Sequence, residues 1–302
     1  MNFPGGRRFA FSILDDTDDS TLENVRPVYD RLRDYGLRTT KTVWPLDCPE
    51  GSRNYFAADT LQRSGYLSFV QELVRDGFEL AFHGATMESS HRERTLRGLE
   101  FLEREFGHRP RLYANHGENR ENLYWGAERF RTPALRALLK RLQRRHPPGW
   151  FAGEVEGSPY FWGDACRETF RYVRNFTFRG LNVLAVNPKM PYQLESSPYV
   201  NYWFSTADAH DAQAFRRRVT RDALDRLEEE GGVCILSTHL GKGFAHDGRL
   251  HPEVDEVFGY LAAKPGWFVP VSTILDHLRE RNPQGFLGSF DLLRLELRFL
   301  SD

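Results

Sequence analysis

The stretch that decides the fold is Phe9-Ala-Phe-Ser-Ile-Leu-Asp15-Asp16-Thr-Asp-Asp19. Residues 9 to 14 are apolar apart from Ser12, which is typical of a strand buried on both faces. Two carboxylates follow at once, although burying an unpaired charge costs free energy. Catalytic groups collect at the carboxyl ends of strands in α/β sheets and barrels. Asp15 and Asp16 are therefore candidate site residues, the alternative being a solvated acidic turn before a helix.

Strand and helix patterns alternate along nearly the whole chain. Short β-branched, apolar or aromatic runs predict strands, and apolar residues at helical spacing between them predict helices. Strands are expected within 37–44, 78–82, 111–114 and 233–237, and helices within 21–35, 66–76, 91–106 and 211–230. This alternation predicts parallel strands with right-handed crossovers. No linker or repeat divides the chain, so residues 1–302 are expected to form one α/β domain.

The tail at 284–302 has a different pattern and is expected to be a C-terminal extension. Its apolar residues Leu293, Leu295, Leu297 and Phe299 alternate with Arg294, Glu296 and Arg298. Alternation with a period of two predicts a strand with one apolar face. We expect such a strand either to cover the barrel or to pair with a second subunit, which would make a homo-oligomer.

Composition excludes several classes of partner. The formal net charge is -1, so no general attraction to nucleic acid or to an anionic membrane surface is expected. The three cysteines form no CxxC pair and no disulfide framework, which indicates a reducing compartment. The N-terminus lacks the apolar core of a signal peptide, and no segment has the length of a membrane span. A cytoplasmic protein is expected.

Histidines follow several of the predicted strands. His83, His116 and His239 each come just after one, as Asp15 and Asp16 do after the first. A barrel brings all its strand ends to one face, so these side chains are expected to meet. Imidazole and carboxylate together suit zinc, and a catalytic zinc site keeps three protein ligands and one open position. The sequence therefore predicts a divalent metal ion, zinc first, with cobalt, nickel and manganese as alternatives.

At these residues the chain resembles the NodB-homology polysaccharide deacetylases, carbohydrate esterase family 4, over roughly residues 7 to 280. The matching segments are Phe11-Ser-Ile-Leu-Asp15-Asp16, Gly77-Phe-Glu-Leu-Ala-Phe-His83, Gly107-His-Arg-Pro-Arg-Leu-Tyr113 and Val233-Cys-Ile-Leu-Ser-Thr-His239. The resemblance implies a distorted (β/α)7-type barrel with a divalent metal. It implies Asp15 as general base, Asp16 and His83 as metal ligands and His239 as general acid.

The chain departs from the family pattern at two places. The family's second histidine ligand lies four residues after the first, where this chain has Met87. We favour His91 as the third ligand, with His116 as the rival. The third motif's arginine, which orients the base, is replaced by Ala114-Asn115-His116-Gly117, so Asn115 or His116 would take that role or the role is absent. A fourth motif is not placed, although Tyr160-Phe-Trp-Gly-Asp164 is a candidate.

The resemblance implies a metal-dependent deacetylase, a hydrolase that removes an acyl group from a saccharide or a related amide or ester. Aromatic side chains such as Trp125 would suit the faces of sugar rings, although most aromatic residues pack in cores. One alternative is a metal-independent glycoside hydrolase, which needs two carboxyl groups about 5–10 Å apart. Asp15 and Asp16 are neighbours that point to opposite sides, and Glu118 and Asp164 are weak partners. The other alternative is a carbohydrate-binding relative without turnover.

Overall fold

Seven parallel strands form a closed barrel in the computed structural model, which describes residues 3–54, 57–142, 145–283 and 285–302. The strands follow one another around the barrel in chain order, and β7 pairs with β1 to close it. Their bounds are β1 Phe9–Asp15, β2 Thr40–Val43, β3 Glu79–Phe82, β4 Leu112–Tyr113, β5 Tyr172–Phe178, β6 Tyr202–Asp208 and β7 Val233–Thr238. The expected single-domain (β/α)7-type barrel with parallel strands is confirmed.

The barrel is distorted at β1, which has three neighbours. On one side β1 pairs with β7 from Ala10 to Asp15. On its other side the short strand β10 (Gly266–Trp267) pairs with the beginning of β1, and β2 pairs with its end. Every residue of β1 is buried, as the apolar run predicts. The strand therefore runs through the centre of the molecule and delivers its last residues to the carboxyl end of the barrel.

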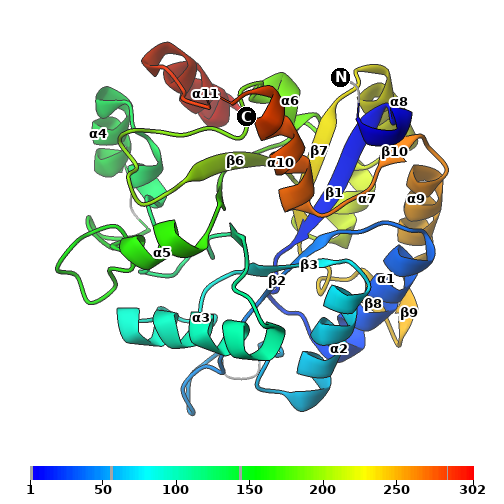
Figure 1. Cartoon of the computed structure of the whole chain (residues 1–302), viewed down its shortest axis with the longest axis horizontal. Helices are drawn as coiled ribbons and strands as arrows, with labels where there is room; N and C mark the ends of the chain where they lie inside the picture. Colours follow the sequence, from blue (N-terminus) through cyan, green and yellow to red (C-terminus); the bar gives the residue numbers. More distant parts are fainter. Residues whose placement is uncertain (1–2, 55–56, 143–144, 284) are drawn as a thin grey trace.

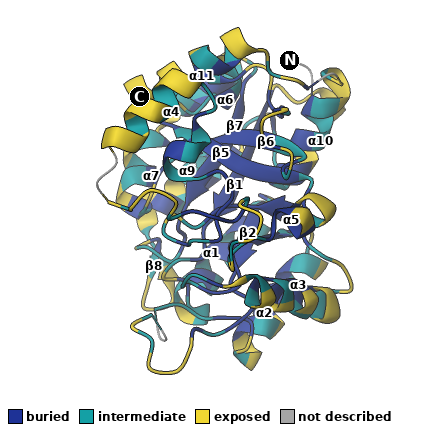
Figure 2. Cartoon of the chain, turned by 90° about the vertical axis from the view of Figure 1, so that its left-hand side faces the viewer, coloured by how far each residue is buried: buried dark blue, intermediate teal, exposed yellow. Residues whose placement is uncertain are grey.

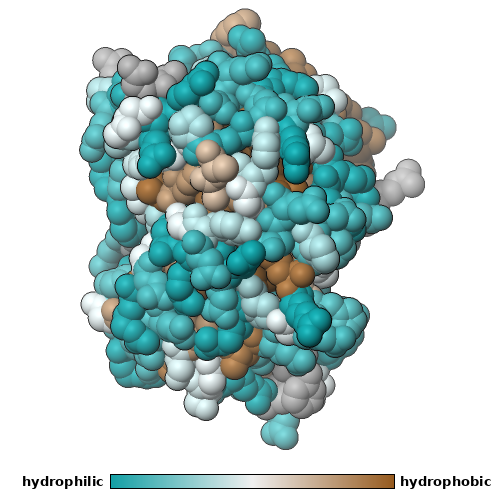
Figure 3. Space-filling model, turned by 90° about the vertical axis from the view of Figure 1, so that its right-hand side faces the viewer, coloured by the Kyte–Doolittle hydropathy of each residue, from teal (hydrophilic) through white to brown (hydrophobic). Residues whose placement is uncertain are grey.

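Helices cover the outside of the barrel and leave the strands buried (Figures 1 and 2). Their apolar sides face the strands, whereas the outer face shown in Figure 3 is mainly hydrophilic, with only small apolar patches. The helices are α1 Leu22–Asp34, α2 Ser64–Arg75, α3 Arg92–Phe106, α4 Pro133–Leu142, α5 Gly163–Thr169, α6 Val183–Val186, α7 Ala212–Arg218, α8 Arg221–Glu229, α9 Pro252–Ala262, α10 Val271–Arg281 and α11 Ser289–Ser301. A hairpin of β8 (Ala245–His246) and β9 (Arg249–Leu250) and the 3-10 turns η1 (Pro4–Gly6) and η2 (Gly126–Arg129) complete the fold.

Two helix ends show how local sequence sets the elements. Thr21 caps α1, because its side chain accepts from Asn24 N while the Asn24 side chain accepts from Thr21 N. Gly107 ends α3 in the left-handed conformation, with φ of 76°. The predicted helix at 211–230 is two helices, α7 and α8, since Thr220 accepts from Ala223 N and begins a second helix. In the part of the chain that the structure describes, no helix is both long and apolar enough to cross a bilayer.

The C-terminal tail is a helix, so the strand predicted from its alternation is wrong. Leu292, Leu295, Glu296 and Phe299 share one side of α11, at the spacing of a helix face. Phe299 packs on β5, with its ring centroid 4.7 Å from that of Phe176. The buried Glu296 carboxylate accepts from the backbone N–H groups of Arg131 and Thr132. The tail therefore covers the barrel; residue 284, where the extension was expected to begin, lies outside the described residues.

Candidate active site

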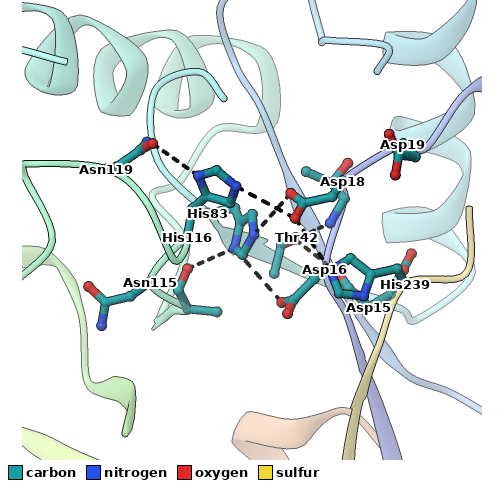
Figure 4. Close-up of polar contacts among 12 residues, drawn as sticks. Asp15, Asp16, Asp18, Asp19, Thr42, His83, Asn115, His116, Asn119 and His239 are labelled. Carbon is teal, nitrogen blue, oxygen red and sulfur yellow. Dashed lines mark hydrogen bonds and ion pairs between the residues drawn. The ribbon is translucent and has the colours of Figure 1, made fainter. Parts of the chain in front are cut away.

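The carboxyl ends of six strands, β1 and β3 to β7, open into one pocket of about 580 Å³. The side chains gathered there come from the turn after β1 and from the segments after β3, β4 and β7 (Figure 4). Of the predicted site residues the pocket is lined by Asp16, His83, Asn115, His116, Trp125 and His239. The expectation that strand-end aspartate and histidine side chains meet at one face is confirmed for these residues.

Asp15 faces away from this pocket and is held in a buried ion pair. Its Oδ2 lies 2.8 Å from Lys41 Nζ and also accepts from the Tyr29 hydroxyl, while Oδ1 accepts from Leu240 N. Both charged side chains are almost fully buried. Burial lowers the pKa of Lys41, but the Asp15 charge outweighs it and the pKa lies above its ordinary value. Asp15 therefore supports the barrel wall and does not lie where the resemblance implied a general base.

Asp16 points into the pocket and is paired with an arginine. Its Oδ2 lies 2.5 Å from Arg174 Nη1 and also accepts from the Ser237 hydroxyl at 3.2 Å. Its Oδ1 lies 3.8 Å from His83 Nδ1 and has no hydrogen-bond partner among the described residues. Burial raises the pKa of Asp16, but the charge of Arg174 and those of two histidines outweigh burial and lower it. One carboxylate oxygen is thus fixed and the other is free to act.

Arg174 supplies the orienting charge that the third motif lacks. Its Nη2 donates to the backbone carbonyl of Asn115 at 2.8 Å, and its Nη1 also contacts the Ser237 hydroxyl. Asn115 accordingly holds the arginine through its backbone, while its side-chain Oδ1 accepts from Leu123 N. The arginine that contacts Asp16 therefore comes from β5 and not from the third motif, where Asn115 and His116 stand.

Asp18 lies at the centre of the histidines. It belongs to a tight turn in which Ser20 N donates to Thr17 O at 3.0 Å and Asp19 takes a φ of 60°, a conformation that aspartate tolerates. The turn brings the Asp18 carboxylate to within 3.4 Å of His83 Nε2, 3.6 Å of His116 Nε2 and 3.3 Å of His239 Nε2. Figure 4 shows these four side chains together, with Asp19 apart from them.

The hydrogen bonds on the other ring nitrogen fix the tautomer of each histidine. His83 Nδ1 lies 2.7 Å from Ala114 O, and His239 Nδ1 lies 2.7 Å from His210 O. A carbonyl oxygen only accepts, so both Nδ1 atoms carry the proton. His116 Nδ1 lies 2.9 Å from Asn119 Oδ1 and donates to it, because the Asn119 amide nitrogen donates elsewhere. In the neutral rings all three Nε2 atoms therefore present lone pairs toward Asp18.

Three imidazole lone pairs around a carboxylate form a cluster of acceptors, which is an arrangement suited to a positive centre. Asp18 Oδ1 is buried and has no hydrogen-bond partner within the described ranges, although His83 Nε2 is close. Ligand atoms about 2.0–2.1 Å from a tetrahedral zinc ion stand about 3.4 Å apart, which matches these separations. Among the described residues no three His, Cys, Asp or Glu side chains already have the arrangement of a metal site.

Electrostatics distinguish the groups around Asp18. Burial raises the pKa of Asp18, but the close contacts with His239 and His83 outweigh burial and lower it far below its ordinary value. Burial lowers the pKa of His116, and the Asp18 charge does not restore it. Burial lowers the pKa of His239 as well, but there the contacts with Asp18 and Asp16 prevail and raise it. The carboxylates are thus ionised at neutral pH.

His91 does not join this group. It is exposed, precedes α3 and lines a separate hollow with Pro49, Ser89, Glu93, Arg94 and Arg97. Its ring lies against Tyr160, with centroids 4.8 Å apart. The preference for His91 over His116 as third ligand is therefore corrected, because His116 is the histidine that shares the pocket with His83.

The acids proposed for a glycoside hydrolase lie elsewhere. Asp164, in the candidate fourth motif, forms an ion pair with Arg92 at 2.6 Å and is half-exposed. Glu118 forms ion pairs with Arg145 and His146. Neither acid lines the pocket that holds Asp16. The described residues therefore bring no second carboxylate from these two positions to the site.

Three residues that set the arrangement of the candidate site and its surroundings were missed from the sequence: Asp18, Arg174 and Lys41. Lys41 and Arg174 are charged residues inside the buried strands β2 and β5, and both are buried. A buried charge is stable only when paired, so each of them signals a partner acid. Asp18 carries a weaker signal, since it sits in an acidic run where only the turn geometry selects it.

Comparisons with known proteins support the fold. No protein-family model matches the chain, and no curated protein matches it. Among solved structures, a protein from Mycobacterium smegmatis assigned to the polysaccharide deacetylases aligns with a TM-score of 0.54 at 16% identity. The PuuE allantoinase aligns with a TM-score of 0.55, also at 16% identity. In both cases the alignment covers 93% of each chain, so the likeness extends over nearly the whole barrel.

Proposed function

We propose that this protein is a metal-dependent hydrolase that removes an acyl group, such as acetyl, from a saccharide or a related amide or ester. The observation that carries the proposal is the Asp18 carboxylate surrounded by three imidazole Nε2 atoms. A cluster of this composition, in the pocket at the carboxyl end of a barrel, suits a divalent cation. The fold shared with a protein assigned to the deacetylases adds support.

Asp18, His83 and His116 would hold the cation, and zinc is the metal that their chemistry favours, with cobalt, nickel and manganese as alternatives. The hydrogen bonds of His83 Nδ1 and His116 Nδ1 orient both rings and strengthen them as ligands. When bound, a divalent ion supplies a Lewis acid that polarises an acyl carbonyl and acidifies water. This set replaces the one expected from the sequence, since Asp18 takes the place of Asp16 and His116 that of His91.

The remaining groups would move protons. Asp16 would act as general base through Oδ1, which faces the pocket without a partner while Arg174 and Ser237 hold Oδ2. The ion pair keeps the carboxylate ionised and therefore able to accept a proton from water. His239, whose raised pKa favours the protonated ring, would donate the proton on Nε2 to the departing amine or alcohol, and its Nδ1–H bond to His210 O holds the ring in place.

The class of substrate is inferred from the aromatic lining of the pocket. The same fold occurs in a protein assigned to the polysaccharide deacetylases and in an allantoinase, and fold does not choose between their chemistries. Trp125 lines the pocket and offers an aromatic face to a sugar ring. Acylated saccharides are therefore the first substrates to test. A carbohydrate-binding relative without turnover stays the alternative.

The test combines metal analysis with an acetate-release assay. The purified protein should contain about one equivalent of zinc or another divalent ion and should release acetate from N-acetylated or O-acetylated saccharides. Prolonged chelation should abolish release, and added metal should restore it. Metal without release from any acylated substrate would favour the binding protein. A fully active protein free of metal would contradict the proposed mechanism.

Assembly and location stay predictions. The outer side of α11 exposes Phe290, Leu297 and Leu300, so association of two copies through the tail is still expected, by a helix and not by a strand. Size-exclusion chromatography with light scattering would test it. A cytoplasmic location and the lack of nucleic-acid or membrane binding rest on composition and on the cysteine pattern.

A further inference from the structure

Arg129 is a pocket arginine that no step of the proposed mechanism uses. It ends η2, and its guanidinium lies over the indole of Trp125, with 3.9 Å between the guanidinium carbon and the ring centroid. Phe176 and Phe299 flank the same group at 5.5 and 5.3 Å. Both Trp125 and Arg129 line the pocket that holds Asp16 and Asp18. The aromatic rings fix the plane of the guanidinium beside the candidate catalytic groups.

The contacts of Arg129 leave much of its hydrogen-bonding capacity unused. Nη2 donates to the backbone carbonyl of Asn175, and Nε contacts Asn175 Oδ1 at 3.5 Å. A guanidinium has five N–H donors, so an edge remains for a ligand. Within residues 3–54, 57–142, 145–283 and 285–302, no carboxylate lies within ion-pair distance of it. Burial and the nearby charge of Arg174 lower the pKa of Arg129 to about 9, so it stays charged at neutral pH.

The other charged side chains of the pocket do not neutralise the positive charge of Arg129. Arg174 is committed to Asp16, and Arg218 lies 3.7 Å from Asp208. Among the described residues the pocket is lined by four aspartates and four arginines. A divalent cation at Asp18 would give this balanced set a net positive charge. An anionic group on the substrate would supply the partner that Arg129 lacks, since arginine binds carboxylate and phosphate through two parallel N–H bonds.

We propose that Arg129 determines specificity by binding an anionic oxygen group, a carboxylate or a phosphate, on the acylated substrate. This inference rests on the proposed function, because it names the class of substrate for that site. Trp125 would support the sugar or other apolar part while holding the guanidinium flat. Acidic or phosphorylated acyl-sugars would then bind more tightly than neutral ones.

Equilibrium binding tests the proposal without requiring turnover. Isothermal titration calorimetry on the zinc-loaded protein would compare three monosaccharides: N-acetylglucosamine, which is neutral, N-acetylmuramic acid, which has a carboxylate, and N-acetylglucosamine 6-phosphate. We expect at least one anionic sugar to bind about tenfold or more tightly than the neutral one, because a hydrogen bond to a charged group is worth this much. The preference should shrink with added salt. The sugar that shows it identifies the anion.

Two substitutions and one control assign the preference to Arg129. Arg129→Gln should abolish it, and Arg129→Lys, which keeps the charge without the planar fork, should retain part of it. Arg75→Gln removes an exposed arginine from α2, outside the pocket, and should leave it unchanged. Circular dichroism would confirm that the variants fold. If Arg129→Gln does not fold, the preference of the wild type and its reduction in Arg129→Lys decide.

Two results would overturn the inference: no preference for either anionic sugar in the wild type, or a preference that Arg129→Gln and Arg129→Lys both leave intact. Failure of the proposed function would look different. A protein that prefers an anionic sugar through Arg129 but never releases acetate would retain the anion site and lose the hydrolase assignment. A protein that deacetylates neutral sugars equally well with and without Arg129 would keep the hydrolase assignment and lose the anion site.

Discussion

Arg174 on β5 donates from Nη1 to Asp16 Oδ2 at the end of β1 across 2.5 Å, although the two residues are 158 positions apart. The pair crosses the open end of the barrel and fixes one oxygen of a pocket aspartate whose second oxygen, Oδ1, has no hydrogen-bond partner among the described residues. This contact supports the proposal that Asp16 is the base, and it places the orienting arginine on β5 instead of in the third motif.

Asp16→Asn should lower kcat by about 10²–10⁴-fold, because general base catalysis contributes this much. The amide keeps the shape of the carboxylate but has no oxygen that accepts a proton at neutral pH. Metal content should stay at the wild-type level, since Asp18, His83 and His116 are intact. Initial rates of acetate release and metal analysis on the same preparation would check both statements. Full activity in Asp16→Asn would refute its role as base.

Lys41→Met should destabilise the fold by about 3–5 kcal/mol, because it leaves the buried Asp15 carboxylate without its cation. The double variant Asp15→Asn, Lys41→Met should recover part of the loss, since it removes both charges. Urea unfolding followed by circular dichroism would measure the free energies of unfolding. A loss below about 1 kcal/mol in Lys41→Met would show that the pair does not hold the barrel wall.

His116→Ala should weaken metal binding by more than about tenfold, since even the loss of a group behind a ligand costs 10–100-fold. His91→Ala is the matched control, because that ring lies outside the pocket and should not affect the metal. Competition with a chelating dye would give both affinities. The opposite pattern, with His91 needed and His116 dispensable, would restore the ligand set first expected from the sequence.

The partly buried Glu154 carboxyl is expected to make the free energy of unfolding depend on pH. Burial raises its pKa from 4.5 to about 7, although Tyr124 N donates to the carboxylate. Between pH 4.5 and 7 the unfolded chain has lost this proton while the folded protein keeps it, so stability falls as the pH rises. Glu154→Gln should therefore gain about 1–3 kcal/mol over the wild type on going from pH 4.5 to 7.5.

Urea unfolding at several pH values would test this difference. Glu229→Gln, at an exposed position at the end of α8, is the control and should show no such trend. A difference between Glu154→Gln and the wild type that stays constant with pH would mean that the Glu154 carboxyl has an ordinary pKa in the folded protein.

Most of the barrel could be predicted from the sequence because its strands are short apolar runs that end in polar residues. β1, β3 and β7 are of this kind, and their ends do meet. The tail was missed because Leu293, Leu295 and Leu297 satisfy a period of two, while the buried face of α11 also includes Leu292 and Glu296. Because the buried face of this helix includes a glutamate that accepts from two backbone N–H groups, a count of apolar residues does not recognise it as a helix face.

The site was predicted by residue type but not by role. Consecutive strand residues point to opposite faces, so only one of Asp15 and Asp16 could enter the pocket, and the sequence near them does not say which. The choice depends on Lys41 and Arg174, which lie in other strands. His116 was placed second to His91 because spacing along the chain says little about which loop turns inward.

The turn after β1 has one more consequence. Thr17, whose N–H is bound by the Thr42 hydroxyl, is the single residue between the aspartate that meets an arginine and the aspartate that meets three imidazoles. A search that requires two adjacent acids would pair Asp15 with Asp16 and overlook the combination that shares the pocket. Distant relatives of this barrel are therefore better found by comparing the positions of their acidic groups in the structure than by searching for adjacent acidic residues in the sequence.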